Sequence, residues 1–140
     1  MELNRKAKGD LAELMVATDL RKRGYKIAFP YGEDWDFDLI LCGDDGALER
    51  VQVKHAQSDG RVVMIRTRSC SLTNGKVRAV KRYTTATIDW LAAWEPKLDR
   101  CYYIPAAELG EGMNTLSLRL VPTLNGQARR IRAAADYTVI

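Results

Sequence analysis

A tight turn between two apolar segments constrains the fold of this chain more than any other feature of its sequence. Residues 43–46 read Gly-Asp-Asp-Gly and separate the apolar segments Phe37–Cys42 and Leu48–His55. Two short strands joined by such a turn pair with each other in antiparallel orientation. Tyr25–Phe29 alternates as a further short strand and stops at Pro30. The sequence therefore predicts a three-stranded antiparallel meander.

Helical and strand patterns flank this meander. From Asn4 to Arg23 apolar residues recur at helical spacing, and Gly24 is placed to end the helix. The residues in this pattern are Leu11, Leu14, Met15, Val16 and Leu20. Arg61–Arg68 and Lys76–Arg82 are predicted as two further strands, with Asn74-Gly75 as a hairpin turn between or near them.

A second helix is predicted at Thr84–Trp94, because Ile88, Leu91 and Ala92 have core spacing and a threonine is available as N-cap. The remaining predictions are a strand at Cys101–Ile104, a short helix at Ala106–Leu109, a strand at Leu116–Val121, a turn at Asn125-Gly126 and a basic stretch at Arg129, Arg130 and Arg132. This element order predicts an α/β sheet with a C-terminal extension.

Length and composition favour a single domain over residues 1–140, because a chain of this size that is 46% hydrophobic can bury its own core. Cys42, Cys70 and Cys101 are odd in number and form no CxxC pair, so neither a disulfide framework nor a zinc ribbon is indicated. No apolar run approaches the ~20 residues of a membrane span, and the first residues lack the apolar core of a signal peptide. We expect a soluble, cytoplasmic protein without a membrane partner.

Charge is unevenly distributed along the chain. The net charge of +4 permits nucleic-acid binding without establishing it. Between residues 33 and 49 all the charged side chains are acidic, namely Glu33, Asp34, Asp36, Asp38, Asp44, Asp45 and Glu49. Between residues 60 and 88 they are all basic, namely Arg61, Arg66, Arg68, Lys76, Arg78, Lys81 and Arg82. Each run alone is typical of a solvated face, but together they fit a cation site beside a phosphate-binding surface.

Four polar residues are candidates for a functional site. Two of them occupy positions where an apolar residue would be expected, and the other two lie on the same face of one strand. Glu13 lies on the helix face that otherwise packs inward, where a carboxylate needs a cation or hydrogen-bond partners, unless it reaches water from the edge of that face. Asp38 interrupts an apolar strand, on the face opposite Leu39. Gln52 and Lys54 share one face of the next strand, a pattern that by itself is typical of a half-exposed strand.

The combination of these residues favours phosphodiester hydrolysis. The tight turn pairs the strand of Asp38 with that of Gln52 and Lys54, and Glu13 could reach the same place. Mg²⁺ prefers hard oxygen ligands, and the candidates are Glu13, Asp38, the Gln52 amide and the backbone carbonyl of Val53. Lys54 would supply a fixed cation. Gly9, one turn before Glu13, suggests that backbone or a ligand comes close there.

Three sequence segments resemble motifs of the PD-(D/E)XK nuclease superfamily: KGDLAE ending at Glu13, GEDWDFDLIL containing Asp38, and VQVK ending at Lys54. The resemblance runs nearly end to end. It implies an αβββαβ core with a mixed central sheet flanked by helices, plus a basic β-hairpin. Within the superfamily the chain resembles small single-domain endonucleases, including intron-encoded homing endonucleases, and more distantly the archaeal Holliday-junction resolvases.

The resemblance also implies roles for individual residues. Glu13 supports the metal site with possible help from Asp10, Asp38 is the central ligand, Gln52 fills the (D/E) position and Lys54 is the motif lysine. Asp36 stands where the motif has proline, and both Asp36 and Asp34 rank lower as ligands. The neutral Gln52 implies weaker metal binding than an acid would give. The sole histidine, His55, is expected to be a packed or surface residue.

The expected function is a Mg²⁺-dependent DNA endonuclease, of a site-specific homing type, in which Mn²⁺ can substitute. It would bind double-stranded or branched DNA through basic residues, namely Lys8, Arg61, Arg66, Arg68, Lys76, Arg78, Lys81 and Arg82. Cutting both strands implies a homodimer or homotetramer. The alternatives are a junction resolvase and a catalytically weak DNA-binding module with the same fold, and a restriction or repair role stays open.

Overall fold

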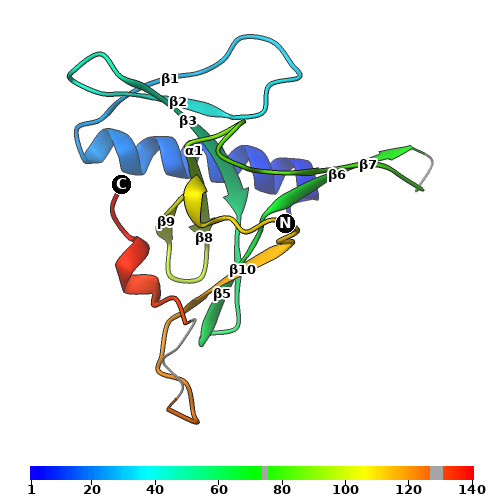
Figure 1. Cartoon of the computed structure of the whole chain (residues 1–140), viewed down its shortest axis with the longest axis vertical. Coiled ribbons are helices and arrows are strands. Elements are labelled where there is room, and N and C mark those ends of the chain that lie inside the picture. The colour runs from blue at the N-terminus through cyan, green and yellow to red at the C-terminus, as the bar shows by residue number, and fades with distance from the viewer. Residues whose placement is uncertain (74–75, 127–130) are drawn as a thin grey trace.

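A five-stranded mixed sheet forms the centre of the protein (Figure 1). The structure is a computed structural model and describes residues 1–73, 76–126 and 131–140. The sheet has the order β1-β2-β3-β8-β9, in which β3 and β8 are parallel and all other neighbours antiparallel. Its strands are β1 (Lys26–Ala28), β2 (Leu39–Cys42), β3 (Leu48–His55), β8 (Trp90–Glu95) and β9 (Arg100–Pro105). The predicted meander is confirmed as β1-β2-β3, and so are the mixed α/β fold class and its central sheet.

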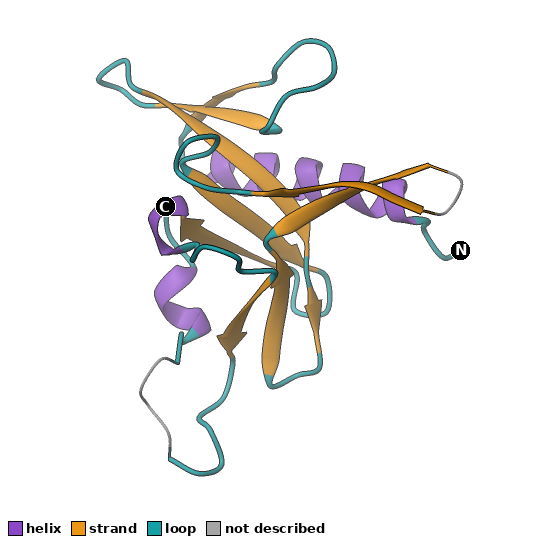
Figure 2. Ribbon diagram, turned by 45° about the vertical axis from the view of Figure 1, so that its right-hand side comes forward, coloured by secondary structure: helices purple, strands orange, loops and turns teal. Residues whose placement is uncertain are grey.

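Helix α1 (Arg5–Lys22) covers one face of this sheet (Figures 1 and 2). It begins where the Asn4 side chain accepts a hydrogen bond from the Ala7 amide at 2.9 Å, and it ends before Gly24, whose φ is +89°. Its buried residues pack against β2, β3, β8 and β9, and they are Ala12, Val16, Ala17 and Leu20. Leu14, predicted on the apolar face, is 61% exposed because it lies on the far side of the helix.

A second core fills the opposite face of the central sheet. There a three-stranded sheet of β10 (Thr115–Arg119), β5 (Val62–Arg66) and β4 (Gln57–Ser58) packs against β8 and β9. Two short 3-10 helices, η1 (Ala106–Glu108) and η2 (Ala134–Tyr137), add to this side. Strands β8 and β9 are therefore buried on both faces, as strands between two layers are, whereas β1 at the far edge is mostly exposed.

A two-stranded hairpin projects from the body of the molecule (Figures 1 and 2). It consists of β6 (Arg68–Thr73) and β7 (Lys76–Arg82), and we call it the arm. The strand predicted at Arg61–Arg68 is present as β5, but its expected place in a hairpin with Lys76–Arg82 is wrong. β5 belongs to the three-stranded sheet, and β6 is the strand that pairs with β7. The predicted turn at Asn74-Gly75 lies outside the described residues, and so do Arg129 and Arg130 of the predicted basic stretch.

The second helix predicted at Thr84–Trp94 is wrong. Residues 85–87 form a turn, in which the Thr84 hydroxyl accepts a hydrogen bond from the Ala86 amide at 3.2 Å, and β8 follows. Leu91 and Ala93 of β8 face one core while Ala92 and Trp94 face the other. An apolar run buried on both sides has the same residue pattern in a strand as in a helix, so periodicity alone could not separate them.

The remaining predicted elements lie close to their expected places. Residues 101–104 belong to β9, residues 106–108 form η1, and β10 covers most of the strand predicted at 116–121. Cys42, Cys70 and Cys101 are all free thiols. Among the described residues, no helix has the length and apolar character needed to cross a membrane.

Candidate functional site

The carboxyl groups of Glu13 and Asp38 meet where α1 passes the start of β2. Glu13 is half-buried on the helix, as its position on the inward face predicted. Burial, a hydrogen bond with the Asp38 carboxyl, and the negative charges of Asp38 and Asp10 raise the pKa of Glu13 to about 7. Glu13 therefore keeps its proton up to about pH 7 when no cation is near. The convergence predicted for these two residues is therefore present in the structure.

Asp38 is fixed to β3 by two hydrogen bonds, one from its backbone and one through its side chain. Its amide donates to the Val51 carbonyl at 2.9 Å, and its carboxylate accepts from the Val53 amide at 2.9 Å. The aspartate thus stands just before β2, which begins at Leu39, and its side chain takes over a bond to the neighbouring strand. The predicted strand began at Phe37, but β2 begins at Leu39, and Phe37 packs against the core opposite the one that contains Leu39.

Gln52 and Lys54 share the face of β3 that points away from α1. Val51 and Val53 alternate with them and are buried beneath the helix. The Gln52 amide nitrogen donates to the Val53 carbonyl at 3.3 Å, so this bond engages the Val53 carbonyl but not the Gln52 amide oxygen. The shared face predicted for Gln52 and Lys54 is confirmed by this burial pattern.

The Lys54 ammonium points toward the arm. It donates to the Arg68 carbonyl at 3.2 Å and lies 5.0 Å from the centroid of the Tyr83 ring. Within the described residues, no hydrogen bond or ion pair joins Lys54 to Glu13 or Asp38. Sequence reasoning missed both partners of Lys54, because no local pattern brings the arm to β3.

The predicted ligands Glu13, Asp38, Gln52 and the Val53 carbonyl come from adjoining parts of α1, β2 and β3. Among residues 1–73, 76–126 and 131–140, no group of three or more His, Cys, Asp or Glu side chains is arranged to hold a metal ion. Gln52, which fills the position of a third acid in the predicted site, is an amide and does not count toward such a group. The donor set still consists entirely of oxygen atoms, which fits a hard divalent cation better than zinc or copper.

Of the two lower-ranked acids, Asp36 is engaged by the arm and Asp34 is exposed. Asp36 forms an ion pair with Lys81 of the arm, and this pairing raises the pKa of Lys81. Asp34 is exposed and has a φ of +66°. His55 packs edge-on against Trp94, with ring centroids 5.6 Å apart. The pKa of His55 is lowered mainly by burial and, to a smaller extent, by the positive charge of Lys8. His55 is thus a packed residue, as expected.

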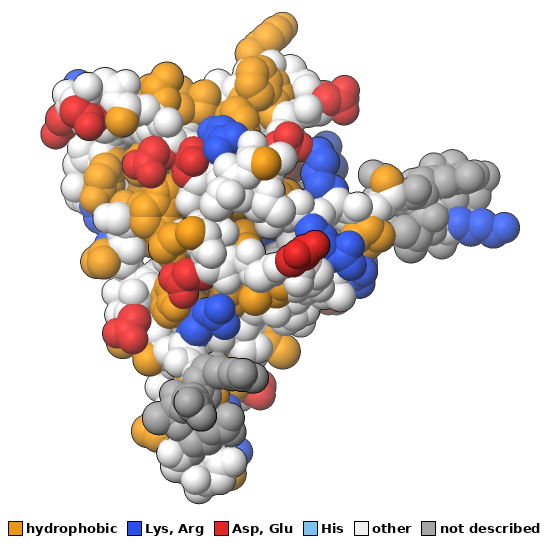
Figure 3. Space-filling view, in the orientation of Figure 1, with side chains coloured by type: hydrophobic (Ala, Val, Ile, Leu, Met, Phe, Trp, Pro, Cys, Tyr) orange, Lys and Arg blue, Asp and Glu red, His pale blue; other side chains and the backbone are white. Residues whose placement is uncertain are grey.

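The predicted DNA-binding residues are spread over α1, β5 and the arm. Arg61, Arg66, Lys76, Lys81 and Arg82 are exposed, whereas Lys8 and Arg68 are half-buried. Arg82 donates to the Asn114 side chain at 3.2 Å. The backbone of Arg78 lies in β7, but its side chain is outside the described part of the chain. Lys and Arg side chains lie at the base of the arm and near its end (Figure 3).

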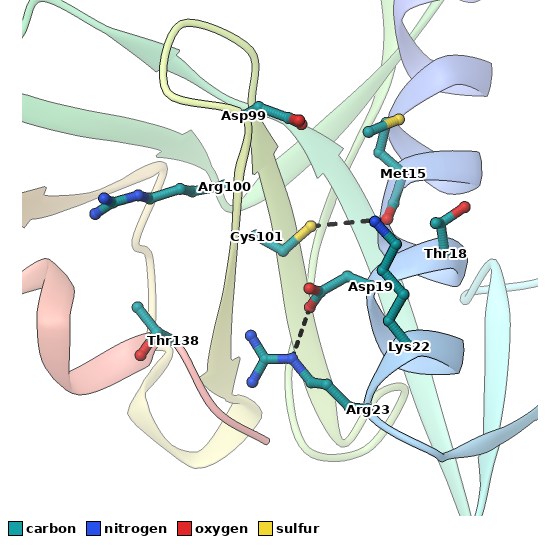
Figure 4. A pocket seen from close by; sticks show the side chains of 9 residues that line it. All are labelled: Met15, Thr18, Asp19, Lys22, Arg23, Asp99, Arg100, Cys101 and Thr138. Atoms are coloured by element: carbon teal, nitrogen blue, oxygen red, sulfur yellow. Dashed lines mark hydrogen bonds and ion pairs between the residues drawn. The ribbon is translucent and has the colours of Figure 1, made fainter.

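A pocket of about 330 Å³ between α1 and the β8–β9 turn is separate from these residues (Figure 4). In it Asp19 pairs with Arg23 at 3.0 Å and accepts a hydrogen bond from the Tyr103 hydroxyl at 2.5 Å. The Cys101 thiol donates to the Met15 carbonyl at 3.8 Å. These groups satisfy one another, so the pocket fits a structural role.

Two comparisons with known proteins give a match over nearly the whole chain. A family model described as PD-(D/E)XK endonuclease matches residues 3–140. The solved structure of a bacterial homing endonuclease, I-Ssp6803I, is similar with a TM-score of 0.74 and 22% sequence identity, over 96% of this chain and 88% of that one. At this identity the likeness concerns the fold. A comparison with curated proteins gives no match.

Proposed function

This chain belongs to the PD-(D/E)XK endonuclease family, and from that premise we propose that it is a Mg²⁺-dependent, site-specific DNA endonuclease of the homing type. Membership of the family supports an endonuclease acting on DNA. The dependence on Mg²⁺, with Mn²⁺ as a substitute, and the recognition of a defined site are our proposal.

The observation that carries the proposal is the meeting of Glu13 and Asp38 beside the strand of Gln52 and Lys54. A half-buried carboxyl whose pKa rises to about 7 is costly to ionise unless a cation is near. The Asp38 backbone is held by its bond to Val51, and its carboxylate cannot turn away without losing the hydrogen bond that it accepts from the Val53 amide. The donors are oxygen atoms of the kind that Mg²⁺ accepts.

Each residue then has a chemical task. Glu13 and Asp38 would hold the divalent ion, with the Gln52 amide oxygen and the Val53 carbonyl as further donors. The bound ion would polarise the phosphate and lower the pKa of a water molecule. Lys54 would place a fixed positive charge beside the scissile phosphate. The arm and the exposed Arg61 and Arg66 would bind the phosphate backbone of the duplex.

The proposal is tested by cleavage of plasmid, linear duplex and four-way junction DNA in parallel, with Mg²⁺ or Mn²⁺. We expect Lys54→Ala and Asp38→Ala each to lower the cleavage rate by about a hundredfold or more, while DNA binding survives. The matched controls are Lys26→Ala, on the exposed edge of β1, and Asp44→Ala, in the turn after β2. Full Mg²⁺-dependent activity in either site variant would rule out the assignment.

A second candidate is a DNA-binding module that has lost catalysis. The neutral Gln52, whose amide is bonded to Val53, favours it because the described site has only two converging carboxylates. Such a protein would bind DNA in a salt-dependent way and yield no product with any divalent cation. Preference for the four-way junction would instead indicate a resolvase.

A further inference from the structure

The base of the arm surrounds the Lys54 ammonium from two sides. Arg68 is the first residue of β6, and its carbonyl accepts from Lys54 at 3.2 Å. Tyr83 directly follows Arg82, the last residue of β7, and its ring centroid lies 5.0 Å from the ammonium. Arg68 and Arg82 are paired across the arm. Both contacts to Lys54 therefore come from the same end of one hairpin.

This end of the arm is anchored in the second core. Tyr83 is only 5% exposed and packs with the core residues between the two sheets. Its amide donates to the carbonyl of the buried Thr67, whose hydroxyl donates to the Met113 carbonyl at 2.7 Å. A buried ring among close-packed neighbours cannot shift without cost. The Tyr83 ring is thus a fixed surface rather than a mobile one.

These contacts restrict a side chain that would otherwise be free to sample many positions. A lysine ammonium sits on a flexible four-carbon stem, and the electron-rich face of an aromatic ring attracts it. The ammonium carries three N–H donors, of which the Arg68 carbonyl takes one. Two donors stay available for a phosphate oxygen. The contacts can therefore fix where Lys54 points without using up its capacity to bind a substrate.

We propose that Tyr83 is a positioning residue for Lys54. By directing the Lys54 ammonium, the base of the arm sets the rate of DNA cleavage. This inference rests on the proposed function. It assigns to Tyr83 no contact with DNA or with the metal site. Loss of the ring face would leave Lys54 charged and present but poorly directed, so the cleavage step slows while DNA binding does not change.

The test compares Tyr83→Leu, which removes the ring, with Tyr83→Phe, which keeps it. Single-turnover cleavage at saturating DNA and Mg²⁺ should slow about tenfold in Tyr83→Leu and stay close to the wild-type rate in Tyr83→Phe. The Kd for duplex DNA, measured without divalent cations, should be unchanged in both. Ile65→Val, which trims the same core without touching Lys54, controls for loss of stability and should cleave at the wild-type rate.

A chemical-shift measurement separates this inference from the proposed function. The ring current of Tyr83 should shift the Lys54 side-chain proton resonances upfield in the wild type and in Tyr83→Phe, and not in Tyr83→Leu. The inference is overturned if that shift is absent, if Tyr83→Leu cleaves as fast as the wild type, or if Tyr83→Phe is as slow as Tyr83→Leu. Absence of cleavage by the wild-type protein would contradict the proposed function and the proposed effect of Tyr83 on the cleavage rate. The chemical shift of the Lys54 protons would still decide whether Tyr83 holds Lys54.

Discussion

The Glu13 carboxyl is unfavourable to ionise because it is half-buried beside Asp38. Burial and the neighbouring acid raise the pKa of Glu13 to about 7 from 4.5. An acid whose pKa is raised by folding adds stability below its unfolded pKa, and that stability is lost as pH rises through the folded pKa. The protein without metal should therefore become less stable between about pH 5 and pH 8.

Glu13→Gln should relieve this effect. At pH 8.5 without metal, we expect the variant to be more stable than the wild type by about 1 to 2 kcal/mol, a figure reduced for partial exposure. At pH 4, where Glu13 is protonated in both the folded and the unfolded chain, the difference should vanish. Urea denaturation at the two pH values measures it. The exposed loop variant Glu33→Gln is the control.

The same substitution should act in the opposite direction on metal binding. Mg²⁺ should raise the Tm of the wild type, because an ion that binds only the folded state stabilises it. Glu13→Gln should lose most of that rise, although it is the more stable protein without metal. A variant that lost stability without metal and kept the full Mg²⁺ effect would show that Glu13 is neither strained nor a ligand.

Sequence reasoning succeeded for residues whose position follows from local periodicity. An inward carboxylate on a helix and an aspartate in an apolar segment both signal an unusual environment, and Glu13 and Asp38 do meet. It could not find the partners of Lys54, because the Arg68 carbonyl and the Tyr83 ring arrive through tertiary folding of the arm. Main-chain acceptors leave no trace in residue identity.

Among the secondary-structure elements, β8 shows where residue patterns are ambiguous. The pairing of β8 with β3 and β9 joins residues far apart in the sequence, so it cannot be read from the local pattern. The apolar run Trp90–Glu95 has no periodicity that distinguishes a strand buried on both faces from a helix. By contrast, α1 could be placed from its sequence because it has one buried face and a capping Asn4. Single-sided burial leaves a periodic signal that double-sided burial removes.

The entry to β8 is held by an ion pair between Asp89 and Arg50 of β3. Arg50 donates to the Asp89 carboxylate at 3.0 Å through Nε, and its amide donates to the same carboxylate at 2.7 Å. Arg50 also donates to the carbonyls of Thr85 and Ala86. These bonds close the turn at 85–87 onto β3 and so determine where the strand begins.

Asp89→Asn should weaken this connection in a pH-dependent way. The Arg50 hydrogen bond lowers the pKa of Asp89 below its usual 3.8, so its stabilisation is present above that value and lost as pH falls through the lowered pKa. We expect a loss of about 1 kcal/mol at pH 7, limited by partial solvent exposure, and little difference at about pH 2. Thermal unfolding across this range measures it. An equal loss at both pH values would show that charge is not the cause.

At the scale of the whole molecule, the described part of one chain contains one candidate site, at Glu13 and Asp38, and one arm. The two strands of a duplex have opposite polarity, so a single such site meets them in different geometries and cuts one strand per binding event. Two-fold symmetry in the protein matches two-fold symmetry in the DNA. A double-strand break by this 15.8 kDa chain therefore implies at least two copies.

We predict that the protein is a homodimer or homotetramer at the concentration at which it cuts. Sedimentation velocity should give a mass two or four times that of the chain, and plasmid DNA should pass to the linear form with little nicked product accumulating. Mixing wild-type protein with Lys54→Ala subunits before assembly should increase the nicked fraction, because a mixed dimer cuts only one strand. A protein that sediments as a monomer and still makes linear product directly would contradict the need for paired sites.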